Sequence, residues 1–517
     1  MPVGAWSVKP RAYGSPAVDV TLGSSGWVTA VAVSVLVPAG APAPLPARLE
    51  PDAIGVTQDT IIGLGNVGPA LSVGLTLAGL AAAAAYAGVP TILICLVPML
   101  VIANAYRRLN LWNANCGASF EWVGRAINPY LGFMTGWLMI AAYVIATVSG
   151  VEVLGPSVLA VFGSNTASTS SNIIIATVVG VAMLIIAIVG IRFTAKSQVA
   201  MAAVEYTILI GFAVVGIYFV LSHHPGTFHA TAGWLSPTGI GGKGSLAAGF
   251  LASVFMFTGW DGTLYVNEEV KHRRVNPGRA AILAVVFLAI IYTLSEVGLQ
   301  GVVSPAKLQN NSSDVLVYVA QAMGGGGWAK VMALSLALSV IATTGTGIVL
   351  SARIVYGMAS YRVLPQFLAN VSRRFATPVA ASILVGLLII GLTWVYLLAT
   401  SVQNAFTDVV DITGLLFAIF YILTALATIV YYRRRVFTSM WDAVVLGLLP
   451  IAAAGFLVWV VVKSLATAPA SQVWSLIGIF GAGLILMLFA RWVLRSSFFQ
   501  IERESDTTNS HRARRSR

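Results

Sequence analysis

Residues 63–72 have the sequence Gly-Leu-Gly-Asn-Val-Gly-Pro-Ala-Leu-Ser, and they lie inside an apolar run at 60–84. Glycine frees the backbone dihedrals and proline removes a hydrogen-bond donor, so this run is not expected to be one regular helix. In a lipid bilayer each freed peptide group costs several kcal/mol, so such a break must line a cavity or bind something. We therefore predict a membrane-spanning helix that is interrupted at its centre by Gly63, Gly65, Asn66, Gly68 and Pro69. Close packing between helices is the alternative interpretation, and we prefer it for Gly74 and Gly79.

The composition places the rest of the chain in a membrane as well. Of the 517 residues, 58% are apolar and only 9% are charged, whereas a soluble domain carries about 25% charged residues. The surface that lacks charge must face lipid. The net charge of +12 is spread over short loops and a tail, so membrane topology explains it better than a nucleic-acid partner does.

Twelve apolar segments are long enough to be membrane-spanning helices, each of which needs about 20 residues. We expect an all-α protein with spans at 60–84, 89–105, 131–160, 173–191, 198–221, 245–266, 280–303, 328–358, 379–400, 408–431, 443–463 and 473–494.

The basic residues predict the orientation of these spans. Arginine and lysine collect in cytoplasmic loops, and here they follow every second span and fill the tail at 496–517. Both termini are therefore expected in the cytoplasm, with residues 1–53 disordered; a secretory signal in this segment is the alternative. The 23 arginines against 7 lysines suggest a GC-rich genome, and hence the inner membrane of a bacterium.

Three stretches resemble the amino acid–polyamine–organocation (APC) permeases. The first runs from Asn115 to Trp137 and has a small-residue pair, an aromatic residue, and Gly-Phe and Gly-Trp steps entering the third span. The second runs from Phe257 to Glu269 and contains Thr-Gly-Trp-Asp followed by Glu-Glu. The third is Ser-Ala-Arg-Ile-Val-Tyr-Gly-Met at 351–358. The resemblance, with the pattern of spans, covers roughly residues 50–495.

This resemblance implies a five-plus-five inverted repeat, at about 54–222 and 245–431, with two extra helices at 443–494. Such transporters bind substrate near the middle of the membrane, where the first and sixth spans are discontinuous. The resemblance thus implies a secondary transporter, with no cofactor, that imports an amino acid or a related organic amine by proton symport. The hydroxyl that binds the substrate carboxylate in many relatives is not in its usual place in the first span.

The sixth span supplies the second half of the expected substrate site. Phe257, Thr258 and Gly259 form its break, and Trp260 would close over the ligand as an aromatic gate or simply pack. Asp261 would either orient the break or face a cationic group. In the first span, backbone N–H groups at the half-helix terminus would hold the substrate carboxylate.

Ionisable side chains inside the membrane are costly and are therefore functional candidates. Glu205 in the fifth span falls where relatives often carry a lysine that replaces a coupling sodium ion. Burial favours the neutral form of a carboxyl group, so Glu205 could carry the coupled proton; a structural hydrogen bond is the alternative. Thr343 and Thr344 in the eighth span are its expected polar neighbours.

Other charged residues receive less specific interpretations. Glu152 and Glu296 could be paired structurally or lie in a water-filled vestibule. Glu268, Glu269 and Arg353 could form a gate, but we expect solvation at the membrane interface. Asp408 and Asp411 are expected to cap the start of the tenth span.

An enzyme is not expected, because no nucleophile–base pair or phosphate-binding loop occurs in a suitable context. His223, His224 and His229 lie in a loop for which solvation is a better interpretation than a metal site. The rival functions are a non-transporting membrane sensor or a channel on the same scaffold. Cys95 and Cys116 are expected to stay reduced.

Overall fold

The structure is a computed structural model that describes residues 48–84, 88–164, 168–222, 234, 245–303, 307, 315–399 and 404–505. Over these ranges the chain is helical, and the extended pairing within them is an isolated parallel bridge between Ile54 and Val270. The predicted disordered segment, the histidine loop and residues 506–517 lie outside the described residues, except for the short stretch at 48–53.

Within the described ranges, ten segments are long and apolar enough to cross a membrane. They are formed by α3 (Gly88–Trp112), α5 with η2 and α6 (Pro129–Val161), α7 (Thr169–Val189), α8 (Ile191–Leu221), α10 (Asn276–Val302), α13 (Gly326–Ser360), α14 (Val379–Ala399), α15 (Asn404–Tyr431), α16 with η9 and α17 (Met440–Thr467), and α18 (Ala470–Trp492). Each coincides with a predicted span.

The two remaining predicted spans, the first and the sixth, are both broken. The first consists of α1 (Val56–Val67) and α2 (Pro69–Ala84), which are separated by Gly68. The sixth consists of α9 (Ser245–Met256) and the short 3-10 helices η5 (Trp260–Leu264) and η6 (Asn267–Glu269). Because each piece is too short to cross a bilayer by itself, the prediction of two discontinuous spans is confirmed.

A third interruption was not predicted. In the third span, α5 (Pro129–Ser149) continues into a 3-10 turn, η2 (Gly150–Val153), before α6 (Leu154–Val161). The second span, by contrast, is not interrupted although it contains a proline: α3 runs through Pro98 as one helix of 25 residues. A single proline or glycine therefore does not decide whether a span is broken.

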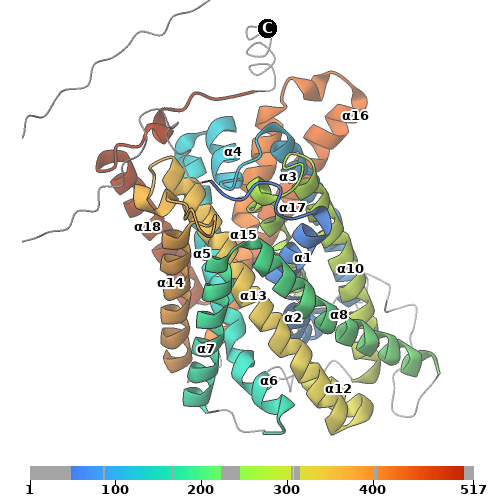
Figure 1. The fold of residues 1–517 in the computed structure, drawn as a ribbon. Helices are drawn as coiled ribbons and strands as arrows, with labels where there is room; N and C mark the ends of the chain where they lie inside the picture. The colour runs from blue at the N-terminus through green and yellow to red at the C-terminus, as the bar shows by residue number, and fades with distance from the viewer. Residues whose placement is uncertain are drawn as a thin grey trace, which may run out of the picture. The chain divides into compact units, whose positions relative to one another are not determined.

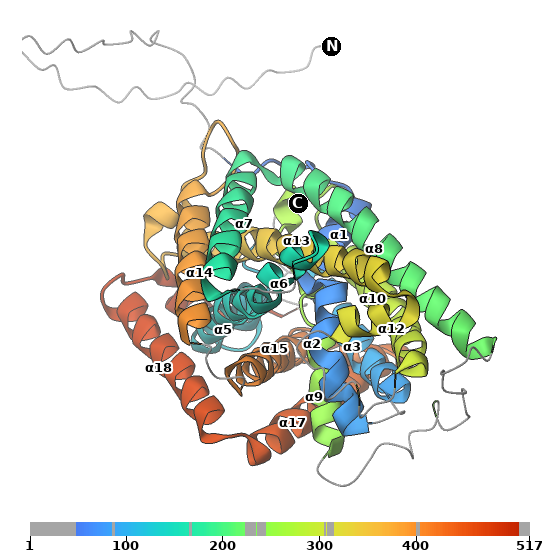
Figure 2. The ribbon, with the colours of Figure 1, turned by 90° about the horizontal axis from the view of Figure 1, so that it is seen from below.

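Figures 1 and 2 show how these helices are arranged. Seen along the bundle in Figure 2, α8, α14 and α18 lie at the rim, whereas α2, α13 and α15 run inside. The burial of the helices agrees with this arrangement, because the most apolar stretch of α13 is 83% buried and that of α18 is only 17% buried. The outer helices thus present their apolar side chains to lipid.

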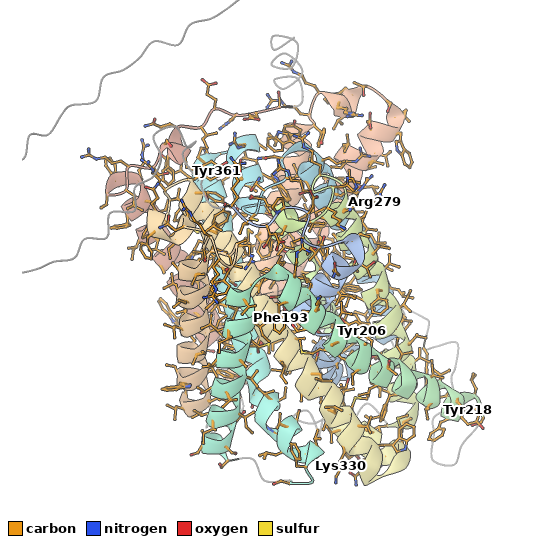
Figure 3. All side chains as sticks on the ribbon, viewed as in Figure 1. Phe193, Tyr206, Tyr218, Arg279, Lys330 and Tyr361 are labelled. Carbon is orange, nitrogen blue, oxygen red and sulfur yellow. The ribbon has the colours of Figure 1, made fainter. Side chains whose placement is uncertain are left out.

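The two ends of the bundle differ in their side chains. We call the end with α4 (Ser119–Ala126), η6 and Arg279 the arginine-rich end. Figure 3 shows Arg279 and Tyr361 at this end and Lys330 at the other, where α12 (Val315–Gly324) lies. Small residues allow helices to approach closely inside the bundle. Where α8 meets α10, a Cβ added at Gly216 would lie 2.6 Å from the carbonyl oxygen of Gly298.

This close approach predicts the effect of adding one methyl group. Gly216→Ala should lower the free energy of unfolding by about 1–3 kcal/mol, because a backbone atom cannot move aside as a side chain can. The matched control is Gly211→Ala on the same helix, where nothing lies within 4 Å of the added Cβ. The measurement is thermal unfolding of the purified protein in detergent. Equal melting temperatures for the two variants would contradict the packing described here.

Candidate functional site

The break in the first span is built by one residue with a left-handed backbone. Gly68 has φ +61°, and its N–H donates to the carbonyl oxygen of Leu64 at 3.0 Å, which closes α1. Pro69 then begins α2 and has no N–H of its own to satisfy. A Cβ at Gly68 would lie 2.5 Å from Thr343 Oγ1, so glycine is required both for the conformation and for the space.

The free N–H groups at the start of α2 bind side chains from two other helices. The N–H of Ala70 donates to Glu205 Oε1 of α8 at 3.1 Å, and the N–H of Leu71 donates to Ser339 Oγ of α13 at 3.1 Å. A helix N-terminus favours negative charge, because its N–H groups and its dipole point at the bound group. Glu205 therefore caps the broken helix from the side.

Glu205 is fully buried, and its second oxygen, Oε2, has no hydrogen-bond partner among the described residues. Thr343 and Thr344 were expected beside Glu205. The hydroxyl of Thr343 instead donates to the carbonyl oxygen of Gly65 at 3.2 Å, which joins α13 to α1. Within the described part of the chain, the Thr344 hydroxyl donates to the carbonyl oxygen of Val340 on its own helix. Sequence reasoning missed Ser339, although it lies four residues before Thr343 and thus on the same helix face.

The break in the sixth span lies directly against the first. Gly259 has φ +105°, and its carbonyl oxygen accepts a hydrogen bond from Asn66 Nδ2 at 3.1 Å. A Cβ at Gly259 would lie 2.6 Å from that same nitrogen. The side chain of Asn66 in the first span thus satisfies the freed carbonyl group of Gly259 in the sixth span.

Asp261 is enclosed by tyrosines. It accepts hydrogen bonds from the hydroxyl groups of Tyr265 and Tyr421, the latter at 2.7 Å. The N–H of Gly259 in turn donates to the Tyr421 oxygen at 3.4 Å. Of the two interpretations of Asp261, the geometry supports the one in which it orients the break. Trp260 is fully buried and stacks on Tyr421 with ring centroids 5.4 Å apart.

A small pocket lies between the two breaks. Its free space is about 20 Å³, roughly the room that one water molecule needs. The lining residues, all uncharged, are Asn66, Val67, Leu71, Ser72, Leu75, Ala146, Ser149, Phe255, Thr258, Gly259, Thr343 and Phe417.

The pocket separates the predicted site residues into two groups. Four of them line it: Asn66, Thr258, Gly259 and Thr343. The others do not line it: Gly63, Gly65, Gly68, Pro69, Phe257, Trp260, Asp261, Glu205 and Thr344. Phe255 and Phe417 were not predicted, because the sequence of an apolar span does not show which face meets the pocket.

At the arginine-rich end, a buried ion pair lies beside the broken spans. Arg353 Nε and Nη2 donate to the two carboxylate oxygens of Glu269 at 3.1 Å each, and both side chains are 0% exposed. Our expectation of solvation at the interface was therefore wrong, because neighbouring helices cover both groups. The backbone of Glu269 also binds the chain before α1, since its carbonyl oxygen accepts from the N–H of Ala53 at 2.8 Å.

Further contacts close this end. The N–H of Lys271 donates to the carbonyl oxygen of Ile54 at 2.9 Å, which completes the bridge between the two broken spans. Glu268 Oε1 accepts from the N–H of Cys116 at 3.1 Å. We call Asn267, Glu268, Glu269 and Arg353 the gate residues.

The other membrane carboxylates have separate surroundings. Glu152 accepts a hydrogen bond from the Tyr396 hydroxyl at 3.0 Å, so it is paired, and Glu296 is buried against Gly88. The capping role expected for Asp411 is wrong, because α15 already begins at Asn404 and Asp411 instead accepts from Gln472. The side chain of Asp408 lies outside the described residues.

Asp59 was missed entirely. It lies in the first turn of α1, is fully buried, and has no hydrogen-bond partner for either carboxylate oxygen among the described residues. Its position before an apolar run offered no sequence signal that distinguished it from a solvated helix N-terminus.

The buried pair predicts a large stability effect. Glu269→Gln should lower the free energy of unfolding by about 3–5 kcal/mol, because it leaves the Arg353 charge buried without its partner. The double variant Glu269→Gln with Arg353→Met should recover much of that loss. The measurement is thermal unfolding in detergent.

The control for this experiment is the exposed ion pair between Arg192 and Glu50, whose side chains are 60% and 39% exposed. Glu50→Gln should cost only about 0–1 kcal/mol. If Glu269→Gln destabilised the protein no more than Glu50→Gln does, the burial of the Glu269–Arg353 pair would be disproved.

Comparison with known proteins gives consistent results. The sequence profile of a family described as "Amino acid permease" matches residues 54–490. Asc-type amino acid transporter 1 of Mus musculus is 31% identical over 153 residues, which cover 30% of this chain and 28% of that protein. The vacuolar cationic amino acid transporter 4 of Arabidopsis thaliana is 22% identical over 65% of this chain and 56% of its own length.

Solved structures share the fold at low sequence identity. MhsT in complex with L-phenylalanine superposes with a TM-score of 0.57 and 15% identity, covering 80% of this chain and 99% of that one. A mutant manganese transporter of Eremococcus coleocola gives a TM-score of 0.53 and 14% identity, over 85% and 94% of the two chains. Because these two proteins have different ligands, the fold alone does not define the substrate.

Proposed function

Because this chain belongs to the amino acid permease family, we propose that it is a secondary transporter that carries an amino acid or a related organic amine by alternating access, coupled to protons. The observation that carries the proposal is the contact between two interrupted spans with a pocket between them. Interrupted helices with half-helix termini at mid-membrane are the usual binding site of secondary transporters.

The pocket supplies the groups that an amino acid needs. Hydroxyl and amide side chains of Asn66, Ser72, Thr258 and Thr343 can bind the polar backbone of a substrate, and Phe255 and Phe417 can pack on its side chain. The pocket is too small for an amino acid in this state. We therefore assign the structure to a closed conformation, which must widen on one side before substrate binds.

Glu205 provides a physical route for coupling. When charged, it holds the positive N-terminus of α2 through the N–H of Ala70. A substrate carboxylate at the same helix terminus would be repelled by that charge. Binding a proton would neutralise Glu205 and release the helix N-terminus for the substrate, so proton and substrate would be carried together. Its unpaired oxygen, Oε2, offers the place for the proton.

The orientation follows from the distribution of charge. We place the arginine-rich end in the cytoplasm, because cytoplasmic loops collect arginine and lysine. The gate residues then close the cytoplasmic side. The chain would reside in the plasma membrane of a bacterium, with both termini inside.

The first experiment identifies the ligand and tests transport. A ligand that binds the folded state raises its melting temperature, so we expect at least one compound in a panel of neutral and cationic amino acids and polyamines to stabilise the purified protein. That compound, radiolabelled, should then enter reconstituted vesicles saturably, and faster when a pH gradient is imposed.

The outcomes distinguish the rival functions. Saturable binding without uptake would instead establish a sensor, and ion conductance that does not saturate would establish a channel. One of the similar proteins is named as an arginine/ornithine antiporter, from Lactococcus lactis subsp. cremoris, so the vesicle assay includes exchange against internal substrate.

The role of Glu205 has its own test. Glu205→Gln keeps the shape and removes the titration, so gradient-driven accumulation should fall to the level without a gradient, while exchange of internal for external substrate continues. The control is Glu152→Gln, which changes another membrane carboxylate that is bonded to Tyr396 and does not line the pocket. Accumulation by Glu205→Gln at the rate of the unaltered protein would remove Glu205 from the coupling mechanism.

A further inference from the structure

The segment Ser496–Ser505, which we call the tail segment, follows the last membrane span and lies against α4. The ring of Phe498 stacks on that of Phe120 with centroids 4.3 Å apart. It also fills the notch at Gly124, where an added Cβ would lie 2.5 Å from Phe498 Cζ. Phe498 is 0% exposed, although it belongs to a segment outside the membrane spans.

Polar contacts hold the tail segment on both sides of this ring. Near its start, Ser496 Oγ donates to the carbonyl oxygen of Tyr361 at 2.6 Å. Near its end, Glu504 accepts from Arg125 Nη1 at 2.8 Å, and the N–H of Glu504 donates to the Arg125 carbonyl oxygen at 2.8 Å. Arg125 also binds Glu121 of its own helix at 2.6 Å. The segment is thus docked through one buried ring and through hydrogen bonds at both ends.

α4, against which the tail segment packs, also contacts the loop that binds the gate residues. The indole N–H of Trp122 donates to the carbonyl oxygen of Asn113 at 2.7 Å, and Glu121 accepts from Asn113 Nδ2 at 2.7 Å. The loop that begins at Asn113 then reaches two gate residues. Cys116 donates its N–H to Glu268 at 3.1 Å, and Asn115 accepts from Asn267 Nδ2 at 2.9 Å.

We propose that the tail segment is an intramolecular latch that holds α4 and the loop at 113–118 against the gate residues, and so stabilises the closed gate. Opening this end separates the loop from Asn267 and Glu268, which displaces α4 from the position that Phe498 and Glu504 recognise. By linkage, whatever releases the tail segment favours opening, and opening weakens its docking. The latch rests on the proposed transport function but does not depend on the identity of the substrate.

Cys116 reports directly on the gate, because it is buried in the closed state and the chain has only one other cysteine, Cys95. Burial raises the pKa of the Cys116 thiol well above its ordinary value, and the charges of Glu268 and Glu269 raise it further. The thiolate is the reactive form. Exposure of this thiol to water, away from both carboxylates, therefore accelerates its reaction with a maleimide.

The experiment measures maleimide labelling of the full-length protein in detergent, in a Cys95→Ser background. Phe498→Ala and Glu504→Gln should each increase the labelling rate of Cys116 about tenfold, within the range typical of coupled sites. Glu502→Gln is the matched control, because it makes the same charge change two residues away on an exposed side chain. Its labelling rate should equal that of the parent.

A second background, Cys116→Ser, separates release of the latch from loss of structure. Cys95 is buried on α3 and contacts α9 through the carbonyl oxygen of Phe250, so it should stay unlabelled in every variant. Unchanged Cys116 labelling in Phe498→Ala and Glu504→Gln would overturn the latch. Equal acceleration at Cys95 and Cys116 would also overturn it, since the tail segment would then support the whole fold and not the gate.

Discussion

A helix that breaks inside a bilayer exposes peptide groups for which no water is available, and the rest of this structure depends on how those groups are satisfied. The N–H groups at the start of α2 bind a carboxylate from α8 and a hydroxyl from α13. The carbonyl oxygen of Gly259 in the other break binds Asn66. These partners position the fifth and eighth spans beside the first, and they leave the pocket between the breaks.

A second constraint acts at the arginine-rich end, where two opposite charges are fully removed from water. The cost of removing these two charges from water is offset because Glu269 and Arg353 pair with each other through two hydrogen bonds. Glu205 is also a carboxyl group removed from water, but its partner is the N-terminus of α2, which serves in place of a cation. The protein therefore keeps one carboxylate against a guanidinium at the arginine-rich end and another against a backbone N–H group at the break in the first span.

Much of the fold was predictable from sequence because membrane spans and helix breaks leave local signals. The cluster of glycines ending in Gly68-Pro69 indicated the break in the first span, whereas the break at Thr258-Gly259 was inferred from the resemblance to the APC permeases. The 3-10 turn at Gly150–Val153 and the burial of Arg353 left no such signal, because both depend on which helices pack around them. Asn66 and Thr258 were named from the sequence as substrate-binding candidates and line the pocket. Phe255 and Phe417, which also line it, and Ser339, which binds the N–H of Leu71, required the three-dimensional arrangement.

The bridge between Ile54 and Val270 ties the chain entering the first span to the chain leaving the sixth. Backbone hydrogen bonds lie on both sides of this bridge: the N–H of Ala53 donates to Glu269, and the N–H of Lys271 donates to Ile54. They join the two extended segments directly. Separating α1 from η6 would therefore require these backbone hydrogen bonds to break together.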